Sequence, residues 1–413
     1  MTSLVWTRVP IVGLCAKHVD CVNRTAPVVD GPTAFKMIRT TNVRNGFIDT
    51  EKVRYVTEAT YKRWTRRLVP QRGDIILTRE APLGDVGKLR TDDYVFLGQR
   101  LYHFRPDPGR LDADFFLYSL MAPDLQGQIR SFGSGATVEH MRLADIPKLE
   151  IAVPPLPIQR QIGRAVAAYD NLIENNTQRI KILEQVARAL YREWFVEFRF
   201  PGHEKHERIT SELGQIPQGW HVVSFTELAD VLSGGTPKTD VREYWNGDVP
   251  FFTPRDAPTC FYVRETEKHL SSLGLSKCSS DLYPPGTVFI TARGTVGKVA
   301  MPSMPMAMNQ SCYALRGTNG ITQAFLFLLT LAQVDYLKKN TGGATFDTII
   351  VDTFRRMQVV EPPLGVIADF TTLVEPMLEE IQNLDSQNAN LREMRDLILP
   401  GVLSGKIDVG GLT

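Results

Sequence analysis

The feature that most constrains the fold of this chain is a long internal repeat. The segment GSGATVEH at residues 133–140 returns as GGATFDTI at 342–349, and the Pro-Pro-Leu at 154–156 returns at 362–364. Both the Ala-Thr of the first pair and the Pro-Pro-Leu of the second return after 208 residues, so the two landmarks keep their spacing. Such a repeat predicts two copies of one structural unit of about 200 residues.

Shorter fragments ahead of these landmarks recur in the same order. RGDIILTREAPLGDVGK (72–88) resembles PGTVFITARGTVGK (285–298), and LGQRLYHFRP (97–106) resembles MNQSCYALRG (308–317). The runs DIILT and TVFIT within the first pair are β-branched and bounded by glycine and proline, which is typical of strands. Apolar stretches at helical spacing follow in each copy, so the front of each copy is predicted to mix strands and helices.

The back of each copy carries a heptad pattern. Apolar residues repeat in alternating steps of four and three, as in a coiled coil, and such a narrow seam requires a second helix, which the other copy supplies. Asn176 and Asn388 are expected to set the register at some cost in stability. The alternative is two separate helices, each packed on its own domain. The predicted seam residues are Ile162, Val166, Ile173, Asn176, Ile180, Leu183, Leu190, Val374, Ile381, Leu384, Asn388, Leu391 and Ile398.

The predicted fold class is α+β. Two mixed α/β domains are joined by two long helices that form an intramolecular antiparallel coiled coil about a pseudo-two-fold axis. The predicted boundaries are 1–151 for the first globular domain, 152–200 for the first helix, 201–360 for the second domain, and 361–413 for the second helix and tail. A helix of roughly 33 residues is about 50 Å long, which exceeds one turn of DNA, roughly 34 Å.

Charge is unevenly distributed along a chain whose net charge is only +1. Residues 1–150 carry 22 Lys+Arg against 17 Asp+Glu, whereas residues 361–413 carry 3 against 9. The stretch KRWTRRLVPQR at 62–72 indicates either a nucleic-acid contact or a solvated surface helix. No apolar run reaches the roughly 18 residues of a membrane span. Five scattered cysteines favour a cytoplasmic location.

No catalytic or metal site is predicted. GDVGK and GTVGK are not phosphate loops, because each lysine is followed by an apolar residue and lacks the earlier glycine. VPPL and EPPL begin with valine and glutamate rather than the asparagine or aspartate that amino methyltransferases use, and both lack the aromatic fourth residue. Cys15, His18 and Cys21 are neighbours, but no second ligand pair follows at zinc spacing.

The order of a globular front, a helix, a second front and a second helix resembles the specificity subunit of type I restriction–modification systems. The resemblance covers nearly the whole chain and rests on the two Gly-Ala-Thr to Pro-Pro-Leu segments, and on LEQVARALYREWFVEFRFP (183–201), LREMRDLILPGVLSGKIDV (391–409) and ELGQIPQGWHVVSFTELADVLSGGTPK (212–238). It implies two target-recognition domains, each reading one half of a bipartite, gapped site in double-stranded DNA. The helices would set the gap.

The resemblance also implies partners. Two methyltransferase (M) subunits would dock on the helices and carry S-adenosylmethionine, and restriction (R) subunits would cut DNA with ATP and Mg. This chain would bind no cofactor itself. A non-catalytic adaptor without sequence-specific DNA binding remains the alternative.

Candidate DNA-binding residues occupy matching places in the two fronts. Arginine, asparagine, glutamine, serine and threonine contact base edges, and arginine also contacts phosphates. The glycine loops additionally expose backbone N–H groups, although they are equally consistent with tight turns. The candidates are Arg39, Asn42, Arg44, Arg79, Gln99, Arg100, Ser134 and Thr137 in the first front, and Thr253, Arg255, Arg293, Asn309, Gln310, Thr341 and Thr345 in the second.

Overall fold

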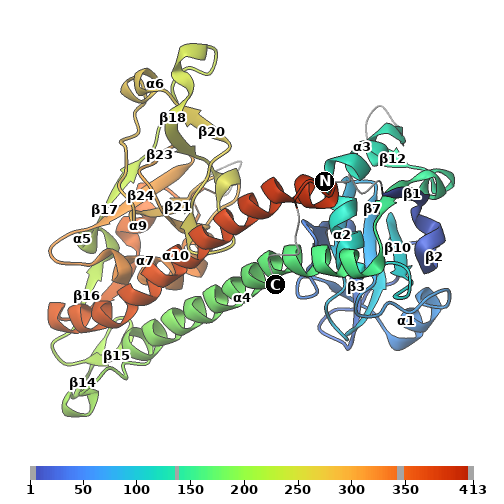
Figure 1. The fold of residues 1–413 in the computed structure, drawn as a ribbon. Helices are drawn as coiled ribbons and strands as arrows, with labels where there is room; N and C mark the ends of the chain where they lie inside the picture. Colours follow the sequence, from blue (N-terminus) through green and yellow to red (C-terminus); the bar gives the residue numbers. More distant parts are fainter. Residues whose placement is uncertain (1–5, 135–138, 342–347, 408–413) are drawn as a thin grey trace. The chain divides into compact units, whose positions relative to one another are not determined.

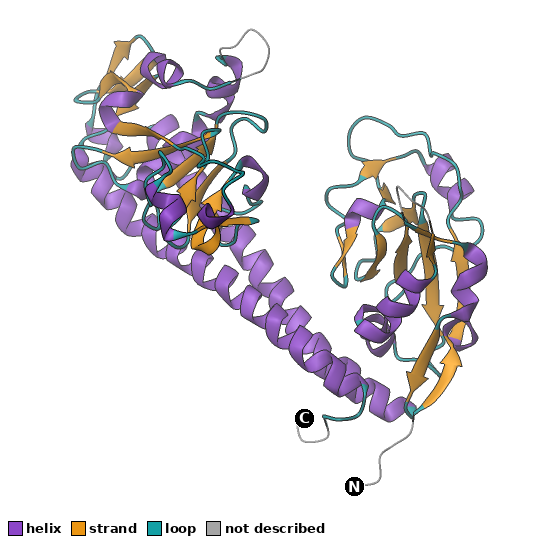
Figure 2. Cartoon of the chain, turned by 90° about the horizontal axis from the view of Figure 1, so that it is seen from above, coloured by secondary structure: helices purple, strands orange, loops and turns teal. Residues whose placement is uncertain are grey.

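A computed structural model of the chain describes residues 6–134, 139–341 and 348–407 (Figures 1 and 2). Its internal contacts divide the chain into two compact units. Unit 1 comprises Met1–Ile173 with Ala389–Thr413, and unit 2 comprises Glu174–Asn388. Each unit therefore contains one globular front together with one part of each long helix.

Unit 1 contains two main sheets. Its strands are β1 (Thr7–Pro10), β2 (Cys15–Asp20), β3 (Phe35–Ile38), β4 (Val43–Arg44), β5 (Phe47–Ile48), β6 (Arg54–Tyr55), β7 (Ile75–Arg79), β8 (Leu83–Lys88), β9 (Tyr94–Leu97), β10 (Leu101–Pro106), β11 (Gly133–Ser134), β12 (His140–Met141) and β13 (Glu150–Val153). Its front helices are η1 (Ile11–Leu14), η2 (Thr40–Asn42), α1 (Glu58–Trp64), α2 (Ala113–Met121), α3 (Pro123–Ser131) and η3 (Leu143–Lys148). The antiparallel sheet has the order β2-β10-β7-β8, and the smaller sheet has the order β6-β3-β9 with β3 and β9 parallel.

The central strand β7 explains how the unit 1 core forms. Ile75 and Leu77 pack on the side of the sheet that α2 covers, whereas Ile76 packs with Ile38 and Val95 on the other side. Neighbouring side chains of a strand point to opposite faces, so a continuous apolar run requires cover on both faces.

Unit 2 contains the second front. Its strands are β14 (Arg208–Ser211), β15 (Gly214–Pro217), β16 (His221–Ser224), β17 (Ala229–Ser233), β18 (Trp245–Phe252), β19 (Tyr262–Val263), β20 (Lys268–Leu270), β21 (Val288–Thr291), β22 (Val299–Pro302), β23 (Ala307–Met308), β24 (Cys312–Gly317) and β25 (Gln358–Glu361). Its front helices are η5 (His203–Lys205), α5 (Phe225–Leu228), η6 (Arg242–Tyr244), η7 (Pro254–Asp256), α6 (Ser272–Ser276), α7 (Gln323–Ala332), α8 (Val334–Lys339) and α9 (Val351–Arg356).

The two fronts share one topology, as the repeat predicts. The order β17-β24-β21-β22 repeats β2-β10-β7-β8, with β19 added beside β22. The order β20-β18-β23 repeats β6-β3-β9, and in both cases the central strand has one antiparallel and one parallel neighbour. The pair β16–β25 likewise repeats β1–β13.

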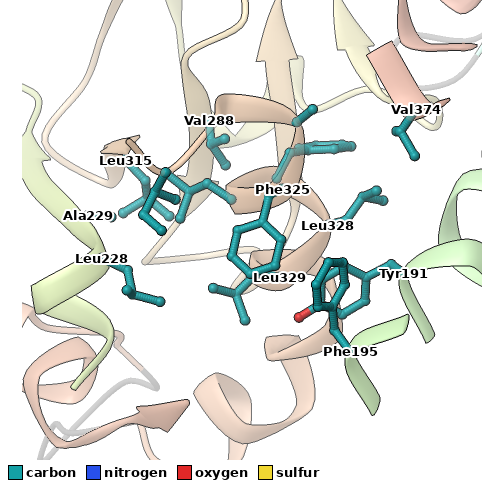
Figure 3. Close-up of a cluster of buried hydrophobic side chains, with 14 of the residues drawn as sticks. Tyr191, Phe195, Leu228, Ala229, Val288, Leu315, Phe325, Leu328, Leu329 and Val374 are labelled. Carbon is teal, nitrogen blue, oxygen red and sulfur yellow. The ribbon is translucent and has the colours of Figure 1, made fainter. Parts of the chain in front are cut away.

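Phe325 on α7 lies at the centre of the unit 2 core (Figure 3). Its ring centroid is 4.9 Å from that of Phe195 and 6.0 Å from that of Tyr191, both at the end of the first long helix. Val288 and Leu315 of the sheet are buried in the same cluster. Helix α7 therefore packs between the sheet and the long helix.

The long helices are α4 (Leu156–Tyr191), which continues as the π-helical turn η4 (Arg192–Val196), and α10 (Leu364–Leu403). They pair in an antiparallel sense. Within unit 2, Thr177 of α4 contacts Asn388 of α10. Two residues further along α4, Arg179 contacts Glu380, which lies eight residues earlier in α10. The alternative of two unpaired helices is therefore wrong.

The predicted seam residues are nearly all buried or half-buried along α4 and α10, but the prediction departs from the observed burial near the end of α10. Leu183, Leu190, Leu391 and Ile398 are half-buried, and the other nine predicted seam residues are buried. After Arg395 the next buried residue is Leu399, a step of four rather than three, so Ile398 lies beside the seam. A straight helix drifts against a seven-residue repeat because 3.6 residues per turn do not divide seven.

No helix in the described part of the chain is long and apolar enough to cross a membrane. The contact-defined units also divide both α4 and α10 internally, so each helix contributes to two cores.

Candidate nucleic-acid interface

Several strand ends of unit 1 meet at one edge, here called edge 1. Strands β3 and β9 are parallel, and the Gly98 N–H donates to the Ile38 carbonyl at 2.7 Å where both strands end. The Arg79 N–H at the end of β7 donates to the Arg100 carbonyl at 2.8 Å. Edge 1 therefore brings together Arg39, Arg79, Gln99 and Arg100, which the sequence places up to 61 residues apart.

The hairpin that carries the glycine loop of unit 1 also leaves from edge 1. Strands β11 and β12 pair, and His140 bridges to Glu80 directly after β7. The Arg79 Nη1 donates to the Met141 carbonyl at 3.0 Å, so part of this guanidinium fixes the hairpin to the sheet. The backbone of Ser134 lies in β11, whereas Thr137 lies outside the described residues.

The turn after β3 carries one buried and one exposed residue of the predicted DNA-binding set. Asn42 is buried, its Oδ1 accepts the Arg39 N–H at 2.9 Å, and its Nδ2 donates to the Lys52 carbonyl at 2.9 Å. Its amide therefore holds the turn and faces the protein interior. Arg44 is exposed. Burial raises the pKa of the Asp85 carboxyl above its ordinary value, and the nearby Arg44 opposes that rise.

The corresponding edge of unit 2, edge 2, has the same hydrogen bonds. The Asn309 N–H donates to the Phe252 carbonyl at 2.9 Å where β18 and β23 end, and the Ala292 N–H donates to the Ser311 carbonyl at 2.7 Å. The turn after β18 is again capped, because the Thr253 N–H and Oγ1 both donate to Asp256 Oδ2, at 2.8 and 2.6 Å.

The remaining predicted residues of unit 2 differ in exposure. Arg255 in the turn after β18 is exposed, and Arg293 and Gln310 on edge 2 are exposed as well. Asn309 is half-buried, and its Oδ1 accepts the Ser311 N–H at 3.0 Å. The half-buried Thr341 Oγ1 is 3.4 Å from the Lys338 carbonyl. Thr345 lies outside the described residues.

Two threonines show which residues of edge 1 and edge 2 are equivalent. Thr78 Oγ1 accepts the Asp85 N–H, and Thr291 Oγ1 accepts the Lys298 N–H, both at 2.9 Å, so these threonines are equivalent. Arg79 therefore matches Ala292 rather than Arg293. Arg293 lies one residue further along, in a bend after the end of β21.

Thr236 is an edge 2 residue that the sequence reasoning missed. Its hydroxyl bonds to Gln310 Oε1. A Cβ on the preceding Gly234 would lie 2.2 Å from the Asn309 carbonyl oxygen, so only glycine allows this approach. The sequence did carry a signal for this close approach, because the glycine pair in SGGTPK directly follows an apolar run typical of a strand.

The basic stretch at 62–72 is helical only as far as Trp64, where α1 ends, so the surface-helix interpretation holds for its first three residues alone. Lys62 pairs with Glu58 one turn earlier on α1 at 2.7 Å. Arg72 pairs with Asp92 at 2.8 Å, and Arg67 pairs with Asp20. Much of this cationic charge is therefore already matched by carboxylates, which leaves less of it for phosphates.

No group of three or more His, Cys, Asp and Glu side chains suited to a metal ion exists within 6–134, 139–341 and 348–407. His18, one of the residues considered for zinc, bonds through Nδ1 to the Tyr102 hydroxyl at 2.7 Å. Edges 1 and 2 instead present guanidinium, amide and hydroxyl groups, which suit phosphates and base edges.

Comparisons with known proteins place this chain among similar sequences and structures. The specificity subunit of the type I restriction enzyme MjaIX from Methanocaldococcus jannaschii is 28% identical over 205 residues, covering 49% of this chain and 46% of that protein. The chain thus matches about half the length of that relative. The putative MjaX specificity subunit from the same organism is 21% identical over 391 residues, covering 91% of this chain and 88% of that protein.

A solved structure shares the fold. The S subunit of a type I restriction–modification system from M. genitalium matches with a TM-score of 0.59 at 15% identity, over 97% of both chains. The family described as type I restriction modification DNA specificity domain matches residues 32–185 and 217–383, once in each copy of the repeat. These two matches span most of the sequence, and the chain therefore belongs to the family of type I restriction–modification specificity subunits, which are non-catalytic.

Proposed function

We propose that this chain reads a bipartite, gapped DNA site, with edge 1 on one half-site and edge 2 on the other. The observation that supports this most directly is the construction of one backbone edge twice with different side chains. Edge 1 carries Gln99 and Arg100 where edge 2 carries Gln310 and Ser311. Because base pairs differ in their pattern of donors and acceptors in the major groove, different side chains on the same scaffold would select different sequences.

Positioning and reading would be divided among these groups. Guanidinium groups can bind phosphates, which orient the domain, or guanine O6 and N7, which carry sequence information. The exposed Arg100 lies 3.4 Å from Glu80, so DNA would have to compete with this exposed ion pair. Exposed ion pairs contribute little, so that competition would be cheap.

We further propose that the chain scaffolds two methyltransferase (M) subunits and the restriction (R) subunits. The adenine methyltransferase with its S-adenosylmethionine, and the ATP and Mg used for cleavage, would belong to those partners. Methylation of a base inside a duplex requires its extrusion from the stack. The chain would accordingly deliver the site, and the partner would extrude and modify the adenine.

The test is single-molecule mapping of methylated adenine in DNA from cells that produce this chain with its methyltransferase. Cells with the methyltransferase alone are the control. The expected result is a new motif of two short half-sites with a fixed gap. A stable complex that leaves no new motif would contradict the proposal and favour the adaptor alternative.

Edge variants sharpen this test. Gln99→Ala with Arg100→Ala should relax the motif only in one half-site, and Arg255→Ala with Gln310→Ala only in the other. Losing a bidentate base contact costs about 1–3 kcal/mol, which is roughly 5- to 150-fold in discrimination.

The matched controls for the edge variants are arginines in ion pairs away from the two edges. Arg8 pairs with Asp124 in unit 1, and Arg316 pairs with Asp230 in unit 2. Replacing either by alanine should leave the motif unchanged.

A further inference from the structure

A buried ion pair joins α4 and α10 within unit 1. Arg395 Nη1 donates to Asp170 Oδ1 at 2.6 Å, and the side chains are 4% and 0% exposed. Tyr118 of α2 donates its hydroxyl to Asp170 Oδ2 at 2.8 Å, and Arg90 Nη2 lies 3.6 Å from the same oxygen. A buried pair of this kind usually costs as much in desolvation as it returns in attraction, so stability alone does not account for it.

The second copy of the repeat fills the same place with apolar residues. Leu378 lies 208 residues after Asp170, and Ala187 lies 208 residues before Arg395. Both are buried in the core of unit 2. The helices therefore pair at this level without any ions, and the ion pair is a feature of one copy only.

A second polar layer shows the same asymmetry. In unit 2, Asn176 Nδ2 lies 3.4 Å from Gln387 Oε1, and Asn388 Nδ2 lies 3.4 Å from Thr177 Oγ1. The two buried asparagines thus lie at one level of the helix pair.

The repeat again places apolar residues at the equivalent positions. Leu384 corresponds to Asn176, and Ile180 corresponds to Asn388. Both are buried. In each of the two polar layers, a polar residue of α4 meets a polar residue of α10.

We propose that these two layers decide which helix pairs with which, so that α4 accepts α10 and rejects α4 of a second copy of the chain. The two helices derive from one repeat, and a second α4 could replace α10 with most of the apolar seam intact. That pairing would place Asp170 of one copy against Ala187 of the other, and Asn176 against Ile180. Each contact buries a polar group without the partner that α10 supplies, and Asp170 keeps only the contacts with its own front.

The same argument applies to two copies of α10. Arg395 would face Leu378 and Asn388 would face Leu384. Removing one partner of a buried ion pair is strongly unfavourable, whereas replacing both partners by apolar groups is often neutral. The layers therefore act by penalising the wrong partner, which is how specificity between similar helices is generally obtained.

The experiment compares the parent chain with a symmetrised full-length variant. Asp170→Leu, Arg395→Ala, Asn176→Leu and Asn388→Ile give each polar position the residue of the other copy. Both proteins carry the reporter Gln178→Cys. In an α4–α4 pair residue 178 lies level with its own counterpart, because that pairing opposes positions 170 and 187, and it is exposed on the face of α4 away from the seam. Each protein is refolded from urea and treated with a bis-maleimide whose long, flexible spacer reaches around the helix pair.

The expected result is a rise of about tenfold or more in cross-linked dimer for the symmetrised variant over the parent. The intramolecular advantage of pairing within one chain is the same in both, so the ratio isolates the layers. Proteins without the reporter give the background from the native cysteines. Arg179→Ala with Glu380→Ala, which removes an exposed ion pair between the same helices, should leave the dimer at the parent level.

A symmetrised variant that folds and stays at the parent level of dimer would overturn the proposal. If circular dichroism shows that this variant does not fold, the double variant Asn176→Leu with Asn388→Ile takes its place. It replaces the second polar layer alone with the apolar residues of the other copy, and it should also raise the dimer above the parent. Failure of that rise would overturn the proposal equally.

Discussion

At the residue scale, the turn after β3 depends on one buried amide. Asn42 satisfies the Arg39 N–H and the Lys52 carbonyl. Asn42→Ala should lower the free energy of unfolding by about 1–3 kcal/mol, because it leaves buried polar groups without partners. Urea denaturation measures this change. The exposed neighbour variant Arg44→Ala should shift it by no more than about 0.5 kcal/mol, and equal losses in the two variants would contradict the structural role of Asn42.

A second residue-scale prediction concerns acid. Burial alone would raise the pKa of Asp74, but hydrogen bonds from Arg105 and His103 outweigh it and hold the pKa below its ordinary value. A lowered folded-state pKa contributes stability that is present above about pH 4 and is lost as the pH falls through the lowered value.

Asp74→Asn should therefore lose less stability than the parent chain between neutral pH and about pH 3. Urea denaturation at several pH values measures the difference. The exposed variant Asp240→Asn serves as the control and should follow the parent. Parallel curves for parent and Asp74→Asn would show that this carboxylate does not contribute.

At the element scale, α10 is held to unit 2 by an aromatic cluster. The ring centroid of Phe370 lies 4.8 Å from that of Phe195, 5.6 Å from Trp194 and 6.2 Å from Tyr191. Phe370→Ala should cost about 3–5 kcal/mol, since it removes a large side chain from a packed core. Leu373→Ala, at an exposed position one turn later, is the control. Thermal unfolding that responds alike to both would refute the assignment.

The two long helices show how much of their buried surface the heptad pattern can predict. The heptad pattern identifies both helices and most of their buried residues, because side-chain spacing on a helix is a local property. It misses Asp170, which is charged and therefore unlike a seam residue, and it misplaces Ile398. The first error arises because Tyr118 of α2 and Arg395 of α10 determine the environment of Asp170, and the second because the helix drifts against the seven-residue repeat.

At the scale of the whole molecule, net charge limits DNA affinity. A chain at +1 neutralises few phosphates by itself. The isolated chain is therefore expected to bind DNA weakly, and its complex with the methyltransferase subunits tightly. Filter binding at several salt concentrations measures both. Nanomolar specific binding by the isolated chain would contradict this prediction.

The two-copy plan, the mixed fronts and the long helices could all be predicted from the sequence, because repeats, strand runs and heptads are patterns of the residues themselves. It also placed most candidate DNA contacts in segments that converge on edges 1 and 2. Only the folded chain shows that Asn42 faces inward and that Asp170 meets Arg395. These facts depend on strand register and on partners as far as 225 residues away, which no local pattern records.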